Sequence, residues 1–122
     1  MKRKIFLIAL ALLTLQGCDS GEDKVKKFIK CGLAVNELGD ETARNNFDKN
    51  KSNILDGKAP ELTSYDIARI GSEARDELGT YFPNKRERAR RMIDEYEKGY
   101  CVDTHKVPKG EKIEFLKRVI DY

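Results

Sequence analysis

Apolar residues recur along most of this chain at the three- and four-residue spacing of a helix face. The longest such stripe consists of Ile67, Ile70, Gly71, Ala74 and Leu78. Spacing of this kind is typical of an amphipathic helix, whereas a half-buried strand requires strict alternation over several residues, and no useful stretch of that alternation is present. The pattern predicts helices over 24–38, 41–50, 63–79, 85–100 and 110–121.

Residue types at the expected helix ends support these boundaries. Gly39 follows the first helix, where glycine is favoured, and Asp40 can cap the second. Thr63 and Asp66 have the spacing of a capping box at the start of the third helix. The second helix is the weakest, because it is rich in asparagine, a poor helix former. We therefore expect a small all-α bundle of four to five helices.

Two stretches are expected to be loops. Residues 49–60 contain Asp56-Gly57, a turn signal, and residues 102–109 contain Pro108, which cannot donate the hydrogen bond that a helix requires. His105 falls in the second stretch, so we expect it on a surface loop.

Cys31 and Cys101 are expected to form one disulfide that holds the bundle together. Cys31 lies on the apolar face of the first helix, and Cys101 follows the last apolar position of the fourth. Paired thiols are usual in exported proteins. A metal site made of these cysteines and His105 is the alternative, but no fourth ligand or CxxC spacing accompanies them. The disulfide is the favoured interpretation.

Export itself is indicated by the first eighteen residues. Three basic residues in 1–4 precede an apolar run over 5–15, interrupted only by Thr14. This arrangement is typical of a secretory signal. The run is too short to cross a bilayer, which requires about 20 apolar residues.

The end of this signal, Leu15-Gln16-Gly17-Cys18, resembles the lipobox of bacterial lipoproteins. The resemblance implies that Cys18 carries a diacylglycerol and becomes the first residue after cleavage. It divides the chain into a signal peptide (1–17), a lipidated tether (18–23) and a periplasmic helical domain (24–122). Asp19 resembles a retention signal that favours the inner over the outer membrane, without excluding the outer one. No family resemblance is found for the helical domain.

Removal of the signal changes the charge of the protein. The whole chain has 24 basic and 21 acidic residues, and three of the basic ones lie in residues 1–18, which contain no acidic residue. The rest of the chain is therefore formally neutral. This balance gives no support to a nucleic-acid partner.

The densest charge cluster opens the fourth expected helix and consists of Lys85, Arg86, Arg88, Arg90 and Arg91. Opposite charges spaced i, i+4 can pair along this helix as Glu87/Arg91, Arg90/Asp94 and Arg91/Glu95. A solvated, locally paired face is therefore the simpler interpretation. The charges left over are the best candidates for a partner-binding edge, and they are Lys85, Arg86 and Arg88.

No residue pattern indicates catalysis, a cofactor or a metal. A catalytic His105 would need an oriented acid and a nucleophile nearby, and sequence neighbours alone do not supply them. The clustered carboxylates are expected on solvent-facing helix surfaces, and they are Asp76, Glu77, Asp94, Glu95 and Glu97. Phosphate-binding glycine loops and zinc-motif spacing are absent from the sequence.

The sequence therefore favours a non-enzymatic protein-binding module anchored to the bacterial envelope by lipid. Small disulfide-linked helical domains on such anchors resemble immunity, inhibitor or exclusion proteins, which is an analogy of architecture and not of motif. The alternative is a structural accessory subunit of an envelope assembly.

Overall fold

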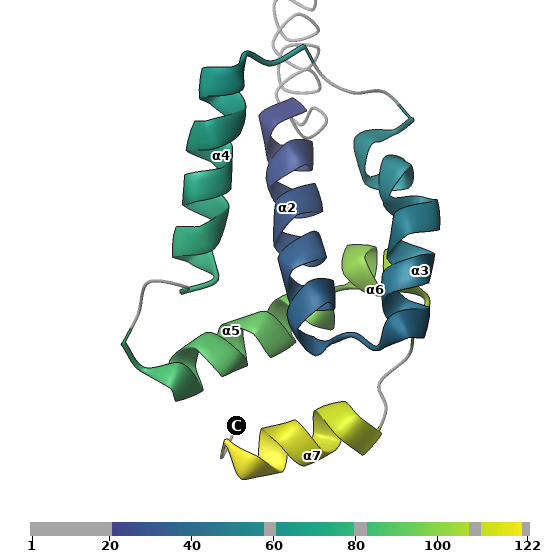
Figure 1. The fold of residues 1–122 in the computed structure, drawn as a ribbon, viewed down its shortest axis with the longest axis vertical. Coiled ribbons are helices and arrows are strands. Elements are labelled where there is room, and N and C mark those ends of the chain that lie inside the picture. Colours follow the sequence, from purple (N-terminus) through teal and green to yellow (C-terminus); the bar gives the residue numbers. More distant parts are fainter. Residues whose placement is uncertain (1–20, 58–60, 80–82, 108–110, 121–122) are drawn as a thin grey trace, which may run out of the picture.

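The protein is all-α in this computed structural model, which describes residues 21–57, 61–79, 83–107 and 111–120. These ranges contain no strand, and the fold class expected from the periodicity is confirmed. The elements, drawn in Figure 1, are α2 (Gly21–Leu38), α3 (Glu41–Asn50), the 3-10 helix η1 (Lys51–Leu55), α4 (Ser64–Glu77), α5 (Lys85–Tyr96), α6 (Gly99–His105) and α7 (Glu111–Val119). The expected signal peptide and Cys18 lie outside the described residues.

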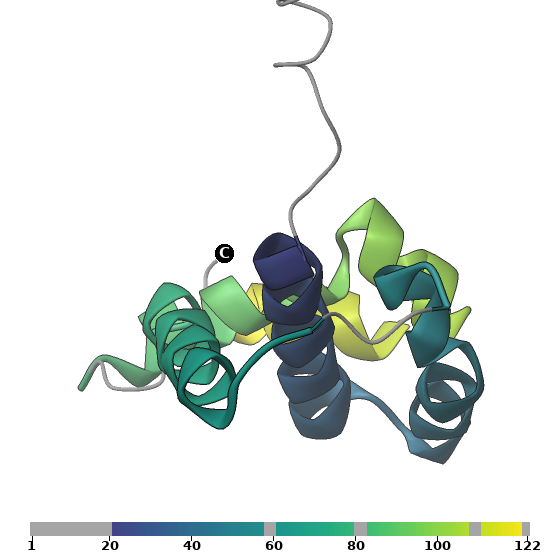
Figure 2. The same cartoon turned by 90° about the horizontal axis from the view of Figure 1, so that it is seen from above.

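Helix α2 is the centre of the bundle. It runs between α4 on one side and α3 on the other, an arrangement that both views show (Figures 1 and 2). It also contacts α5 and η1. Helix α5 crosses near the C-terminal end of α2, and α7 lies beyond that end of the bundle (Figure 1).

The hydrophobic core lies between α2, α3, α5, α6 and α7. Its buried members are Cys31, Ala34, Val35, Ala43, Phe47, Ile93, Tyr96, Cys101 and Ile113. Helix α4 buries a separate stripe, Ile70, Gly71, Ala74 and Leu78. Full burial of one large aliphatic side chain stabilises a fold by about 2 kcal/mol, so this stripe favours packing of α4 against α2. Ile67, expected in the same stripe, is instead 49% exposed.

The expected helix caps are present. The side chain of Asp40 accepts a hydrogen bond from the backbone N–H of Ala43 at 2.8 Å. Thr63 and Asp66 form a complete capping box, in which each side chain accepts from the other's backbone N–H. Asp56 and Gly57 both adopt the left-handed conformation, which confirms the turn after η1.

Two helix boundaries differ from the sequence prediction by three residues or more. Residues 21–23, expected to belong to a flexible tether, are helical and form the first described turn of α2. The helix expected over 85–100 ends at Tyr96, and a second helix, α6, begins at Gly99. Glycine is a poor helix former, and Lys98 is extended between the two helices. The stretch expected to be a loop from residue 102 is therefore helical as far as His105.

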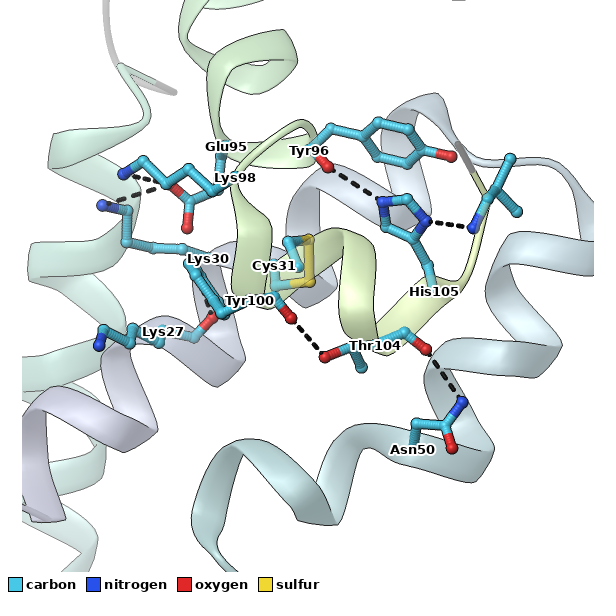
Figure 3. Close-up of a disulfide and its surroundings, with 12 residues drawn as sticks. Lys27, Lys30, Cys31, Asn50, Glu95, Tyr96, Lys98, Tyr100, Thr104 and His105 are labelled. Atoms are coloured by element: carbon cyan, nitrogen blue, oxygen red, sulfur yellow. Dashed lines mark hydrogen bonds and ion pairs between the residues drawn. A yellow bond between two sulfur atoms is a disulfide. The ribbon is translucent and has the colours of Figure 1, made fainter. Parts of the chain in front are cut away.

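The break between α5 and α6 brings Cys101 against Cys31. The two residues form the expected disulfide, with 5.5 Å between their Cα atoms, and both are fully buried (Figure 3). The bond joins positions 70 residues apart and ties the short helix α6 directly to α2.

We expect loss of this disulfide to destabilise the protein by about 4 kcal/mol, because a bond closing a loop of this length restricts the unfolded chain by roughly that amount. The measurement is urea unfolding of the wild type against the variant Cys31→Ala/Cys101→Ala. The wild type with reductant should unfold at nearly the same urea concentration as this variant. An unchanged midpoint in both samples would contradict the prediction.

Candidate functional site

His105 is the most buried polar side chain of the fold, which corrects the expectation of a surface loop. It closes α6 and is fully buried. Its Nδ1 accepts a hydrogen bond from the backbone N–H of Val107 at 3.0 Å, so Nε2 carries the proton and donates to the carbonyl of Tyr96 at 3.0 Å. The imidazole also stacks on the Tyr96 ring, with 4.1 Å between centroids (Figure 3). The neutral ring is thus held on both nitrogens.

This environment disfavours a charged or catalytic imidazole. Burial lowers the pKa of His105, and the hydrogen bond to the Tyr96 carbonyl opposes that shift only in part. A general base must reach the proton of a substrate, and this ring is not accessible. Cys31 and Cys101 cannot serve as metal ligands either, because their sulfur atoms are joined to each other. No group of three His, Cys, Asp or Glu is placed to hold a metal ion in the ranges that the structure describes.

Asparagines of α3 complete the polar surroundings of α6. Asn46 donates to the carbonyl of His105 at 2.9 Å. Asn50 donates to the carbonyl of Thr104 at 3.1 Å, a contact that Figure 3 shows. The last carbonyls of a helix have no hydrogen-bond partner within the helix. These side chains therefore supply hydrogen bonds to carbonyl groups that would otherwise lack them. The sequence shows these asparagines only as poor helix formers, and their partners are more than 50 residues away.

Glu95 is also buried, although the sequence placed it on a solvent face and paired it with Arg91. Its side chain is 2% exposed, and its Oε2 lies 2.9 Å from Lys98 Nζ and 3.6 Å from Lys30 Nζ (Figure 3). Lys30 lies 3.6 Å from Glu77 of α4 as well. The carboxylate therefore belongs to an ion network that joins α2, α4 and α5.

The basic cluster at the start of α5 contains local ion pairs. Glu87 accepts from Arg91 at 3.2 Å, which confirms the i, i+4 pair expected there, and Arg90 also lies 3.5 Å from the same carboxylate. Arg91 donates in addition to the backbone carbonyl of Glu77 at 3.1 Å. One carboxylate is thus shared by two guanidinium groups, and the first turns of α5 keep an excess of positive charge.

A groove opens beside this cluster, between the C-terminal end of α2 and the first turns of α5. Its volume is about 390 Å³, and its lining residues are Glu37, Leu38, Lys85, Arg88, Ala89 and Met92. Leu38 and Met92 also pack on the hydrophobic core, so the apolar floor is fixed by the bundle itself. The groove brings together two of the three expected partner-binding residues, Lys85 and Arg88. The third, Arg86, is exposed but is not among the lining residues.

The α5 side of the groove has a signal in the sequence that the charge analysis missed. Lys85, Arg88, Ala89 and Met92 are spaced i, i+3, i+4 and i+7, so they share one helix face. On this face two cations adjoin two apolar residues. It is therefore suited to a ligand that has both an anionic and an apolar group. The α2 side, Glu37 and Leu38, has no comparable signal, because its position depends on how the two helices cross.

None of the helices in the described part of the chain combines the length and the apolar character needed to cross a membrane. Comparison of the chain with protein-family models, with curated proteins and with solved structures finds no match.

We expect the protein to lose stability as the pH falls below about 6.5, the ordinary pKa of histidine, because of His105. The pKa of His105 is lowered in the folded protein, so the unfolded chain binds the proton more readily in this range and protonation favours unfolding. The slope attributable to one such group is at most about 1.4 kcal/mol per pH unit.

The measurement is the free energy of unfolding from pH 7.5 to 5, compared between the wild type and His105→Gln. Glutamine can donate from its amide near the position of Nε2 but does not titrate, so the variant should lose the slope whatever its stability at pH 7.5. Parallel pH profiles would show that His105 is not responsible.

Proposed function

We propose that this protein is a lipid-anchored component of the bacterial envelope whose helical domain binds another protein and performs no chemistry itself. The single observation that carries the proposal is the groove at the α2–α5 crossing, where an apolar floor lies beside exposed positive charge. Residues 19–122 taken together are formally neutral, so this positive charge is local. Interfaces commonly combine an apolar centre with a polar, charged rim. An immunity, inhibitor or exclusion role requires a surface of this kind and no catalytic group.

The position of the groove fits a domain that is attached to a membrane at its N-terminal end. Gly21 is the first described residue of α2, and Glu37 and Leu38 lie at the other end of the same helix. A helix of 18 residues is about 27 Å long, so this distance separates the groove from the point where the proposed tether joins the domain. The groove therefore remains accessible to a partner when residue 18 is held at a bilayer surface.

The anchor is tested with Cys18→Ala in a Gram-negative host. We expect the wild type to incorporate an alkyne-labelled fatty acid and to sediment with membranes, because two or more acyl chains give stable attachment. The variant should not incorporate the label and should no longer sediment with membranes. Labelling of the variant equal to that of the wild type would show that Cys18 is not the lipid site.

The binding role is tested by placing a photoreactive benzophenone amino acid at position 85 in the full-length chain in cells. The matched control carries the same amino acid at position 49, an exposed lysine on α3. We expect an ultraviolet-dependent adduct of one discrete mass from position 85 and none from position 49. A partner that is a subunit of an assembled envelope machine would favour the accessory role over the immunity or inhibitor type. Equal adducts from both positions, or no adduct from either, would contradict the proposal.

A further inference from the structure

We propose that the groove between α2 and α5 binds an acidic segment of a partner protein by taking one large aliphatic or aromatic side chain onto its floor and the neighbouring carboxylates onto Lys85 and Arg88. This inference rests on the proposed binding role and adds the chemical class of the ligand. It is carried by the lining of the groove, by the charge around it and by its place in the fold.

The floor provides the first requirement, a fixed apolar surface of limited size. Leu38, Ala89 and Met92 supply it, and Ala89 leaves the space because its side chain is a single methyl group. The volume of about 390 Å³ lies near the lower end of the range for ligand sites, roughly 300–1,000 Å³, and has room for one bulky side chain. Methionine is unbranched and adjusts to ligands of different shape. A buried anchor side chain is therefore the apolar part of the ligand.

The charge around the floor provides the second requirement. Lys85 and Arg88 line the groove, and Arg86 adds an exposed cation on the same first turn. Neither Lys85 nor Arg86 has an ion-pair partner among the residues that the structure describes. Arginine forms paired hydrogen bonds with carboxylates, and its charge attracts acidic partners over a Debye length of about 10 Å in dilute salt. The polar part of the ligand is therefore anionic.

A protein segment fits these observations better than an anionic lipid surface. Glu37, on the α2 side of the groove, would oppose a uniformly negative bilayer, whereas a peptide can place its carboxylates on one side only. A concave floor is filled by a single protruding side chain and not by a flat surface. The groove also lies at the end of α2 opposite Gly21, away from the proposed anchor.

The test uses the full-length chain in nonionic detergent and three fluorescein-labelled peptides of twelve residues. The first has a central leucine pair flanked by glutamates, the second replaces the glutamates by glutamine, and the third replaces the leucines by serine. We expect saturable binding of the first peptide, at least tenfold tighter than that of either other peptide, in fluorescence anisotropy at 50 mM salt. The affinity of the first peptide should fall further at 500 mM salt, because screening weakens the rim contacts.

Two variants address the two parts of the groove, and each leaves the other part intact. Lys85→Glu should lower the affinity for the first peptide about fivefold. The matched charge reversal Lys49→Glu on α3 should leave this affinity within about twofold of the wild-type value. Ala89→Phe should abolish saturable binding because the ring occupies the floor. Circular dichroism melting of each variant distinguishes a lost site from a lost fold, and an unfolded Ala89→Phe leaves Lys85→Glu as the deciding comparison.

Three results would overturn the inference. One is equal binding of the acidic and glutamine peptides, and another is equal loss in Lys85→Glu and Lys49→Glu. The third is groove-dependent binding of phosphatidylglycerol vesicles without binding of the acidic peptide, which would assign the site to a lipid surface. Each result leaves the cross-linking test of the protein-binding role untouched, so the two proposals can fail separately.

Discussion

The attachment of α6 to α2 is the constraint on which the rest of this structure depends. A helix of seven residues has no stability of its own in water, because helix nucleation is costly and few hydrogen bonds follow it. Here the helix is held by a covalent bond to Cys31, by the stack of His105 on Tyr96, and by asparagines of α3 that bind its last carbonyls. Because only residues 97 and 98 separate α5 from α6, the same attachment holds the C-terminal end of α5 close to α2.

A second set of contacts orients α5 from its other side. Lys30 of α2 lies within ion-pair distance of Glu77 on α4 and of the buried Glu95 on α5, so one ammonium group links three helices. Glu95 Oε1 makes no hydrogen bond to a described residue, so this carboxylate is satisfied through its other oxygen alone. Buried ion pairs of this kind often add little net stability, because desolvation offsets their attraction. What the structure shows is their placement, in which one network contacts α2, α4 and α5 at once.

The fold was predictable from the sequence wherever one local signal was sufficient. Periodicity revealed the helices, the capping residues Asp40 and Thr63 marked two helix starts, and the two cysteines of the helical domain allowed a single pairing. Two of the predictions that were wrong concern side chains whose burial depends on packing between helices. Glu95 and His105 are charged or titratable residue types, which are usually exposed. Lys98 and Tyr96 lie near them in sequence, but their burial also depends on α2 and α3, which supply Lys30 and Asn46.

The candidate site was predictable to a similar extent. The excess of positive charge at Lys85 and Arg88 is visible in the sequence, because it belongs to one helix. Its combination with an apolar floor is not, because Leu38 reaches the groove only through the crossing of α2 and α5. Helix patterns show which residues share a face, whereas the partner of that face is decided by packing between elements.

The long span of the disulfide has a consequence for how the protein withstands proteases. Both connections that flank α4 lie between Cys31 and Cys101, as do all of α3 and α5. A single backbone cut at either connection would therefore leave two fragments that remain covalently joined and packed around α2. In a compartment where the disulfide stays oxidised, a molecule cut once would still present its groove. The two fragments would separate only after the disulfide is reduced.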